Sequence, residues 1–287
     1  GKIAHYEMKD IQRQKDPGLR SAVIDAAQGK IRESVDKMAA HTSEIKDRGE
    51  RLNQSAKDYA GQKAEDRQES VILTGSNRDR NELNAQVREE LKAKGELKPG
   101  QQYEIKGQGN AKGTREFAQG DKVIFLQNDR QMGVSNGQTG YIKEINGNSF
   151  KIDSGGKQVD LNLKEYNRLD HGYAITTTKG QGITENKAFI HLDTNQKQLN
   201  SANAYYVDIS RARHEARIYT DDKGKLLFSV ERQQEKLSSK DFAKASPWWV
   251  RDPQDRHRKQ EAFKELPKQV QNQVLKGDRC LARAKAS

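Results

Sequence analysis

The sequence has little of the material that a disulfide-linked, exported or membrane-spanning protein requires. Cys280 is its only cysteine, so neither an intramolecular disulfide nor a thiolate zinc site can form. No run of about 18 apolar residues occurs, and the N-terminus lacks the apolar core of a cleaved signal peptide. These absences favour a cytoplasmic protein with no membrane insertion. The chain begins with Gly1, which we interpret as a sign of a piece cut from a longer protein.

Apolar residues are also scarce. Hydrophobic residues make up 32% of the chain and charged residues another 32%, which predicts one or two modest cores in place of one large core. The net charge of +11 favours a polyanionic partner, because Lys and Arg that neutralise phosphates release condensed counterions. A merely solvated basic surface explains the charge equally well.

The spacing of the apolar residues predicts an α/β domain. Residues 17–38 form two short helices with a break at Gly29, and residues 43–69 form an exposed helix that closes with a loop around Glu65 to Ser70. Residues 70–74 are a strand, followed by a turn and an amphipathic helix that carries Leu83, Val87 and Leu91.

The middle of the chain has a different pattern of apolar and turn residues. Between residues 101 and 170, short apolar strands alternate with tight turns such as Asn136-Gly137 and Asn146-Gly147, a pattern typical of a small β-barrel. Further strands at 174–176, 188–191 and 216–219 indicate that the α/β domain resumes afterwards. The barrel is therefore an insertion. Beyond residue 227 the chain is helical and basic, and we expect Trp248-Trp249 to anchor this tail, although base stacking is the alternative.

The phosphate loop of nucleotide-hydrolysing motors is missing. Each Gly-Lys pair is followed by Ile, Gln or Leu, so no G-x-x-x-x-G-K-[ST] occurs, and no apolar strand ends in Asp-Glu to hold magnesium. The histidines His171, His191 and His214 show no ligand spacing, which predicts no metal site. The chain should not hydrolyse ATP by itself.

Two segments are rich in hydroxyl, amide and arginine side chains. They are Asp170-His-Gly-Tyr-Ala-Ile-Thr-Thr-Thr-Lys-Gly-Gln-Gly-Ile-Thr184 and Tyr205-Tyr-Val-Asp-Ile-Ser-Arg-Ala-Arg213. A strand that ends in such a polar, Gly-rich loop presents hydroxyls and backbone N–H groups to phosphates. The segments resemble motifs V and VI of superfamily 1 helicases, worded T-x-H-K-S-Q-G and Y-V-A-L-S-R-A-R.

Other stretches extend this resemblance from about residue 8 to residue 225. Ile11-Gln-Arg-Gln14 resembles motif IV, and residues 73–88 resemble the T-x-x-N-x-x-R-x-x-L-N-x-x-I-R element that precedes the inserted barrel. Residues 120–140 are similar to the G-D-R-V-I-F-x-x-N-D-x-x-x-G-V-x-N-G-x-x-G of the SH3-like insertion in conjugative relaxase-helicases, the TraI and TrwC group.

The resemblance implies a RecA-like domain 2A from residues 1–98 and 166–225, an inserted SH3-like β-barrel (2B) at 99–165, and a basic helical extension at 226–287. It also implies a parent protein that uses ATP and Mg²⁺ to unwind DNA 5′ to 3′ during plasmid conjugation. The partners would be single-stranded DNA, an upstream helicase domain 1A, a relaxase domain and the type IV coupling protein.

The resemblance also assigns roles to individual residues. The catalytic phosphate contacts would be Arg211, which reaches the γ-phosphate across the cleft between the two motor domains, and Arg13. The other nucleotide contacts would be Gln14, Gly182 and Arg213. The DNA contacts would be Thr176, Thr178, Lys179, Gln181, Asn77 and Arg80. Three positions depart from the family wording, namely Thr178 for His, Gly180 for Ser and Asp208 for Ala.

Two other interpretations remain open. The chain could be a degenerate, non-catalytic helicase module that binds single-stranded DNA or acts as a type IV secretion signal, which the departure at Thr178 would suit. It could also be an SH3-like nucleic-acid-binding protein without motor ancestry, in which Arg211 and Arg213 are salt-bridged surface residues. The ordered motifs favour the motor interpretation over the last.

Overall fold

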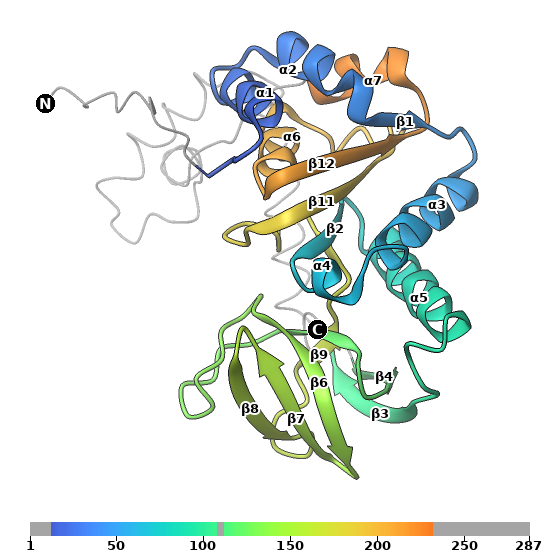
Figure 1. Ribbon diagram of the computed structural model, residues 1–287, viewed down its shortest axis with the longest axis vertical. Helices are drawn as coiled ribbons and strands as arrows, with labels where there is room; N and C mark the ends of the chain where they lie inside the picture. Colours follow the sequence, from blue (N-terminus) through green and yellow to red (C-terminus); the bar gives the residue numbers. More distant parts are fainter. Residues whose placement is uncertain (1–12, 108–111, 232–287) are drawn as a thin grey trace, which may run out of the picture. The chain divides into compact units, whose positions relative to one another are not determined.

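The computed structural model describes residues 13–107 and 112–231. Its centre is a five-stranded sheet in which all neighbouring strands are parallel, in the order β1-β12-β11-β2-β10 (Figure 1). The strands are β1 (Thr42–Glu44), β2 (Ser70–Thr74), β10 (Ala174–Thr176), β11 (Glu185–Leu192) and β12 (Ala212–Thr220). All five residues of β2 are buried, as expected for a central parallel strand covered on both faces. The predicted α/β class with a parallel sheet is confirmed.

Helices cover both faces of this sheet (Figure 1). The described helices are α1 (Pro17–Ala27), α2 (Ile31–Met38), α3 (Arg48–Ala60), α4 (Ala64–Gln68), α5 (Asn77–Ala93), α6 (Ala202–Ile209) and α7 (Lys223–Val230). Alternate side chains of a strand point to opposite faces. Val71 and Leu73 accordingly pack in the core shared with α1, α2, α6 and α7, and Ile72 packs in the core shared with α3 and α5.

Helix-capping residues set several of these boundaries. Asp16 accepts a 2.7 Å hydrogen bond from the Leu19 N–H, and Pro17 occupies the first turn of α1, where its missing N–H costs nothing. Gly29 has a φ of +78°, which suits the predicted break between α1 and α2.

The expectation of an exposed helix at residues 43–69 is wrong. This segment contains β1, α3 and α4, and α3 buries Leu52, Ala56 and Tyr59 in the second core. These three residues lie at helical spacing on one side of α3, so a sparse apolar stripe was sufficient to cover the sheet.

A second sheet is inserted between α5 and β10. Its antiparallel order is β8-β7-β6-β5-β9 (Figure 1). The strands are β5 (Lys122–Phe125), β6 (Thr139–Asn146), β7 (Ser149–Ser154), β8 (Lys157–Asn162) and β9 (Leu169–His171), with a separate hairpin of β3 (Gln101–Lys106) and β4 (Lys112–Phe117). The hairpin packs on the sheet through Tyr103 and Phe117, whose rings lie 5.0 and 5.8 Å from that of Phe150. The inserted β-unit is thus present, and β9 extends it past the predicted boundary at residue 165.

Buried charges join the inserted unit to the parallel sheet. Arg88 on α5 forms a two-pronged pair with Asp121, at 2.9 and 3.1 Å, and Asp121 also accepts a hydrogen bond from the Tyr173 hydroxyl. The buried Lys122 ammonium donates to the Ser70 carbonyl over 2.8 Å. Burial lowers the pKa of Lys122, and the charge of Glu185 opposes this effect.

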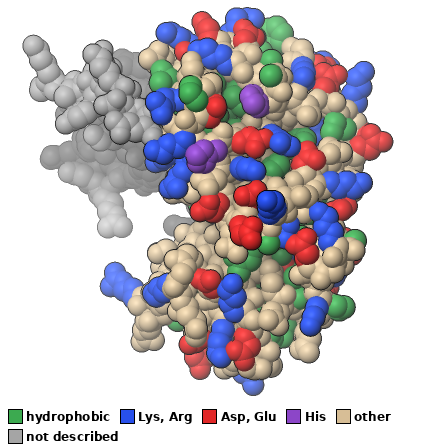
Figure 2. All heavy atoms as spheres, in the orientation of Figure 1, with side chains coloured by type: hydrophobic (Ala, Val, Ile, Leu, Met, Phe, Trp, Pro, Cys, Tyr) green, Lys and Arg blue, Asp and Glu red, His purple; other side chains and the backbone are tan. Residues whose placement is uncertain are grey.

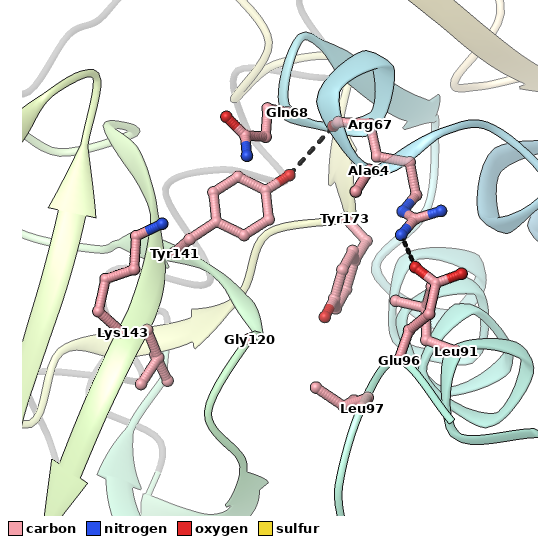
Figure 3. A pocket seen from close by; sticks show the side chains of 11 residues that line it. Ala64, Arg67, Gln68, Leu91, Glu96, Leu97, Gly120, Tyr141, Lys143 and Tyr173 are labelled. Atoms are coloured by element: carbon pink, nitrogen blue, oxygen red, sulfur yellow. Dashed lines mark hydrogen bonds and ion pairs between the residues drawn. The ribbon is translucent and has the colours of Figure 1, made fainter. Parts of the chain in front are cut away.

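A pocket of about 230 Å³ lies beside this junction (Figure 3). Its apolar lining comes from Leu91, Leu97 and Tyr173. Among its lining residues, the Tyr141 hydroxyl donates a 3.0 Å hydrogen bond to the Arg67 carbonyl. The Arg67 guanidinium forms an ion pair with Glu96. The Tyr141 hydrogen bond thus links β6 of the inserted unit to the end of α4 beside the pocket.

Some predictions fall outside the described residues. Most of the expected basic extension, with Trp248-Trp249, belongs to residues 232–287, and Ile11 and Gln12 also lie outside. Within the described residues, no helix is both long and apolar enough to cross a membrane.

Candidate nucleotide and nucleic-acid site

Arg211 lies in the tight connection between α6 and β12, and its guanidinium is docked on uncharged acceptors. Nε donates to the Val207 carbonyl (3.0 Å), Nη1 to the Ile183 carbonyl (3.1 Å) and Nη2 to the Ser210 hydroxyl (2.8 Å). The side chain is largely buried, and no carboxylate of the described residues forms an ion pair with it. A buried guanidinium whose hydrogen bonds all go to uncharged oxygens can exchange them for an anion.

The segment before α1 runs alongside this connection. The Gln14 amide donates 3.1 Å hydrogen bonds to the carbonyls of Ser210 and Ala212, on either side of Arg211. The Lys15 N–H donates to the Arg213 carbonyl over 2.6 Å. Gln14 is buried, so it holds the backbone that carries Arg211.

Arg13 precedes Gln14 in the chain, and its charge acts on Arg211. Burial lowers the pKa of Arg211, and the neighbouring charge of Arg13 lowers it further. Arg13 is exposed. Two nearby positive charges repel each other, and an anion bound close to both would relieve this repulsion. The segment at Gln14 and Lys15 thus lies against residues 210–213, and a shared nucleotide site at Arg13 and Arg211 stays a prediction.

The two remaining residues of the nucleotide set lie nearby. Arg213 is exposed at the start of β12, and its charge acts on the Glu185 carboxyl, whose pKa burial raises. Gly182 is exposed and has a φ of +93°, a conformation that favours glycine. Contact between either residue and nucleotide stays a prediction.

The polar loop 177–183 follows β10 and runs to the start of β11. Thr176 is buried, whereas Thr178 and Gln181 are exposed. Lys179 donates a 2.7 Å hydrogen bond to Asn136 in the inserted unit. The loop therefore offers exposed hydroxyl, amide and ammonium groups next to a turn of the second sheet.

The departure at Gly180 has a steric reason. A Cβ at this position would lie 2.9 Å from Leu73 Cδ2 on β2, closer than van der Waals contact allows. The serine of the family wording would need Leu73 to move, so the glycine lets the loop lie directly on the sheet.

Asn77 and Arg80 lie on the first turn of α5, just after β2. Asn77 is exposed. The Arg80 guanidinium lies 3.5 Å from the Asp170 carboxylate on β9 and also donates to Asn81. The charge of Arg80 is thus partly neutralised, which weakens it as a phosphate contact.

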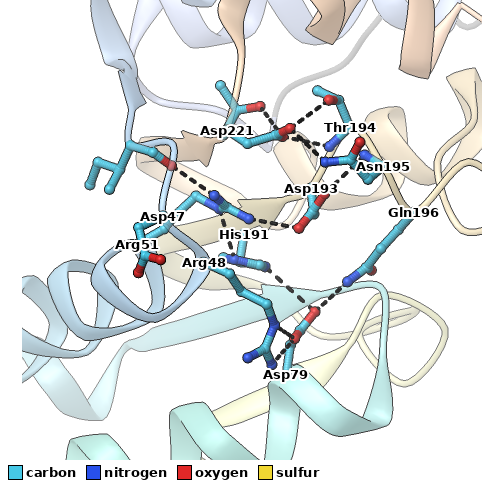
Figure 4. A network of polar contacts seen from close by, with 12 residues as sticks. Asp47, Arg48, Arg51, Asp79, His191, Asp193, Thr194, Asn195, Gln196 and Asp221 are labelled. Atoms are coloured by element: carbon cyan, nitrogen blue, oxygen red, sulfur yellow. Dashed lines mark hydrogen bonds and ion pairs between the residues drawn. The ribbon is translucent and has the colours of Figure 1, made fainter.

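A polar network stabilises the carboxyl ends of β2 and β11 (Figure 4). Arg51 on α3 pairs with Asp193 at 2.7 Å and donates to His191 at 3.1 Å, while the Asp79 carboxylate accepts from Arg48 and from Gln196. Burial, and then the charge of Arg51, lower the pKa of His191 to about 4. His191 is therefore neutral at physiological pH, and its role is to fill a polar core.

Sequence reasoning missed one buried carboxyl close to Arg211. Asp208 on α6 is 2% exposed, and its Oδ2 accepts a 3.1 Å hydrogen bond from the Thr177 hydroxyl. Burial raises the pKa of Asp208 to about 7, although the Thr177 hydrogen bond and the charge of Arg211 each act to lower it. Only its departure from the alanine of the family wording marked this position in the sequence.

Comparison with known proteins finds similar sequences among conjugal transfer proteins. The chain is 28% identical over 263 residues to the conjugal transfer protein TraA of Rhizobium radiobacter, covering 84% of this chain and 22% of that protein. It is 29% identical over 235 residues to TraA of Agrobacterium fabrum, covering 76% of this chain and 20% of that protein. The Pif1 helicase of Candida albicans has a similar fold, with a TM-score of 0.51 and 11% identity over 76% of this chain and 56% of that one.

The chain is thus similar in sequence to TraA conjugal transfer proteins and similar in fold to a Pif1 helicase. It spans about a fifth of the length of the curated relatives that it matches. No protein-family model matches it. Within the described residues, no three His, Cys, Asp or Glu side chains are grouped to hold a metal ion.

Proposed function

We propose that this helicase-like region is the second motor domain of a DNA helicase that acts in conjugative transfer. In this role it supplies half of an ATP site to a domain that carries the phosphate loop, and it binds single-stranded DNA. One observation carries the proposal: Arg211 is buried and docked on neutral acceptors, in a backbone segment that Gln14 holds through the carbonyls of Ser210 and Ala212.

The arrangement suits a phosphate that arrives from a second domain. The three hydrogen bonds of Arg211 use three of its five N–H groups, all to uncharged oxygens. Exchanging these acceptors for a phosphoryl oxygen gains a charge-assisted bond without breaking an ion pair. The Mg²⁺ and the phosphate-loop lysine would come from the other domain, as in other phosphate-loop enzymes. Arg211 would then stabilise the charge that develops on the γ-phosphate.

The loop 177–183 is our candidate DNA surface. Thr178 and Gln181 are exposed, and Lys179 reaches across to Asn136. In the view of Figure 2, basic and acidic side chains are interspersed over the described surface. More than half of the net charge of +11 is carried by residues 232–287. Local donors on the loop, together with that basic segment, would contact the phosphates of the strand.

The chain by itself tests the DNA-binding half of the proposal. A labelled oligothymidylate should bind with an affinity that falls steeply with salt, with a log–log slope of about −0.7 per phosphate neutralised. Lys179→Ala should weaken binding and make the slope shallower by about one contact. Lys151→Ala is the matched control, because Lys151 is exposed on β7 and paired with Glu144. Absence of binding, or a Lys179 variant indistinguishable from this control, would remove the loop from the DNA site.

The same preparation tests the half-site argument. Because the chain carries no phosphate loop, it should show no ATP hydrolysis with or without DNA. Robust ATP hydrolysis by the purified chain would contradict the proposal. Without a phosphate loop, Arg13 and Arg211 alone cannot hold the nucleotide and its metal ion for hydrolysis.

A further inference from the structure

Asp208 is a buried acid for which neither the fold nor the proposed ATP site has an obvious need. It lies on α6, three residues before Arg211. The backbone N–H of Arg211 donates a 3.2 Å hydrogen bond to the backbone carbonyl of Asp208. Its Oδ2 accepts the Thr177 hydroxyl, while its Oδ1 is buried without a hydrogen-bond partner. Burying a carboxyl with one oxygen unsatisfied costs free energy. An alanine, the residue of the family wording, would avoid that cost.

The loop 177–183 contacts this part of α6 at both of its ends. At its beginning, the Thr177 N–H donates a 2.9 Å hydrogen bond to the Thr74 carbonyl of β2, and the Thr177 hydroxyl binds Asp208. At its end, the Ile183 carbonyl accepts the Arg211 guanidinium. A displacement of the loop therefore acts on Arg211 by two routes, directly through Ile183 and indirectly through Asp208.

Between these two ends the loop is exposed. Thr178 and Gln181 face solvent, and the backbone at Gly180 lies against Leu73. Thr177 directly precedes the exposed Thr178, and its hydroxyl donates a hydrogen bond to Asp208 of α6.

We propose that Thr177 and Asp208 are positioning residues that transmit occupancy of the loop to Arg211. In the free protein, the Thr177–Asp208 hydrogen bond keeps the end of α6 in the conformation that docks Arg211 on Val207 and Ile183. When DNA displaces the loop, this bond and the Ile183 acceptor are lost together, and the guanidinium is released toward the position where nucleotide would bind. The inference rests on the proposed function, because it presupposes that the loop binds DNA.

The release of Arg211 can be measured in the chain itself. The Nε–H of Arg211 gives an NMR signal in isotope-labelled protein, assigned by its loss in Arg211→Lys. Its hydrogen exchange should be slow in the free chain, since Nε donates to a buried carbonyl. Addition of an oligothymidylate of about 20 nucleotides, longer than one binding site, should speed exchange by about fivefold or more, the scale of a modest coupling between two sites.

Three variants test the link. Thr177→Val and Asp208→Ala remove the hydrogen bond, so the signal should exchange quickly even without DNA and respond little to its addition. Asp208→Asn keeps an acceptor for the Thr177 hydroxyl and should behave as wild type. If Asp208→Ala does not fold, Thr177→Val still carries the test, because it changes only a half-buried side chain. DNA affinity is measured on the same samples.

The outcomes separate the two proposals. If the wild-type chain binds no DNA, the proposed function fails and the link fails with it. If it binds DNA while exchange at Arg211 is unchanged, the proposed function stands and the link is refuted. Equal DNA responses in Thr177→Val, Asp208→Asn and wild type would also refute the link.

Discussion

The Asp208→Asn substitution should change how the stability of the chain depends on pH. Burial raises the pKa of this carboxyl from its ordinary 3.8 to about 7, so between these values the folded protein keeps a proton that the unfolded chain releases. Each pKa unit corresponds to about 1.4 kcal/mol, so a shift of about three units is worth about 4 kcal/mol. Because the folded pKa is raised, this stability is fully present below pH 3.8 and is lost as the pH rises through about 7.

Asparagine has nearly the same shape, does not ionise, and can still accept the Thr177 hydrogen bond. Urea unfolding at about pH 5 and about pH 8 should therefore show the variant gaining about 3 kcal/mol on wild type at the higher pH, the part of the shift that this window covers. Asp160→Asn, on the exposed face of β8, is the control and should parallel wild type. Parallel profiles for Asp208→Asn and wild type would refute the reasoning that burial outweighs the charge of Arg211 and raises the pKa of Asp208.

Three further substitutions test other parts of the structure. Burial lowers the pKa of His191 from 6.5 to about 4. The unfolding free energy of wild type should therefore fall by about 3 kcal/mol as the pH falls between these values. In the same urea series, His191→Gln should not show this fall. Gln14→Leu leaves two buried carbonyls unpaired and should lower the unfolding free energy by about 1–3 kcal/mol, measured by urea unfolding; an unchanged value would mean that the segment before α1 is not packed there. Arg88→Met leaves the fully buried Asp121 without its partner and should cost about 3–5 kcal/mol in thermal unfolding, and a neutral result would contradict the buried pair at the junction.

Local patterns in the sequence predicted the elements that carry continuous apolar runs or clear periodicity. The strand at 70–74 and the helix bearing Leu83, Val87 and Leu91 are present as β2 and α5. The tight turns at Gly137 and Gly147 have the positive φ values that their sequences favour. These features could be predicted because each depends on neighbours in the chain.

The elements that were missed depend on partners far away in the sequence. β1 has three residues, of which only Thr42 is buried, and it exists because it pairs with the edge of β12. The pairing of Arg88 with Asp121 joins residues 33 positions apart, and no periodicity announces it. The predicted end of the inserted unit at residue 165 leaves out β9, which pairs with β5 of the inserted sheet.

The candidate site shows the same division. A shared site for Arg13 and Arg211 is predicted by a resemblance and not by spacing, since 196 residues separate Gln14 from the Ser210 carbonyl that it binds. The hydrogen bond between Thr177 and Asp208 joins the segments that resemble motifs V and VI. The family motif has alanine at the position of Asp208, so the motif does not predict this bond. Sequence motifs identify which segments carry chemistry, whereas contacts between them require the fold.

The most direct test of the account is DNA-stimulated ATP hydrolysis by a protein that contains both this domain and its phosphate-loop domain. Arg211→Ala should reduce turnover by about 10³-fold or more, the scale of a lost arginine finger, while nucleotide still binds. Arg217→Ala, an exposed arginine of β12 paired with Glu215, should hydrolyse ATP as wild type does. Hydrolysis by Arg211→Ala at the wild-type rate, or none by the wild-type protein, would contradict the claim that this domain completes a working ATP site.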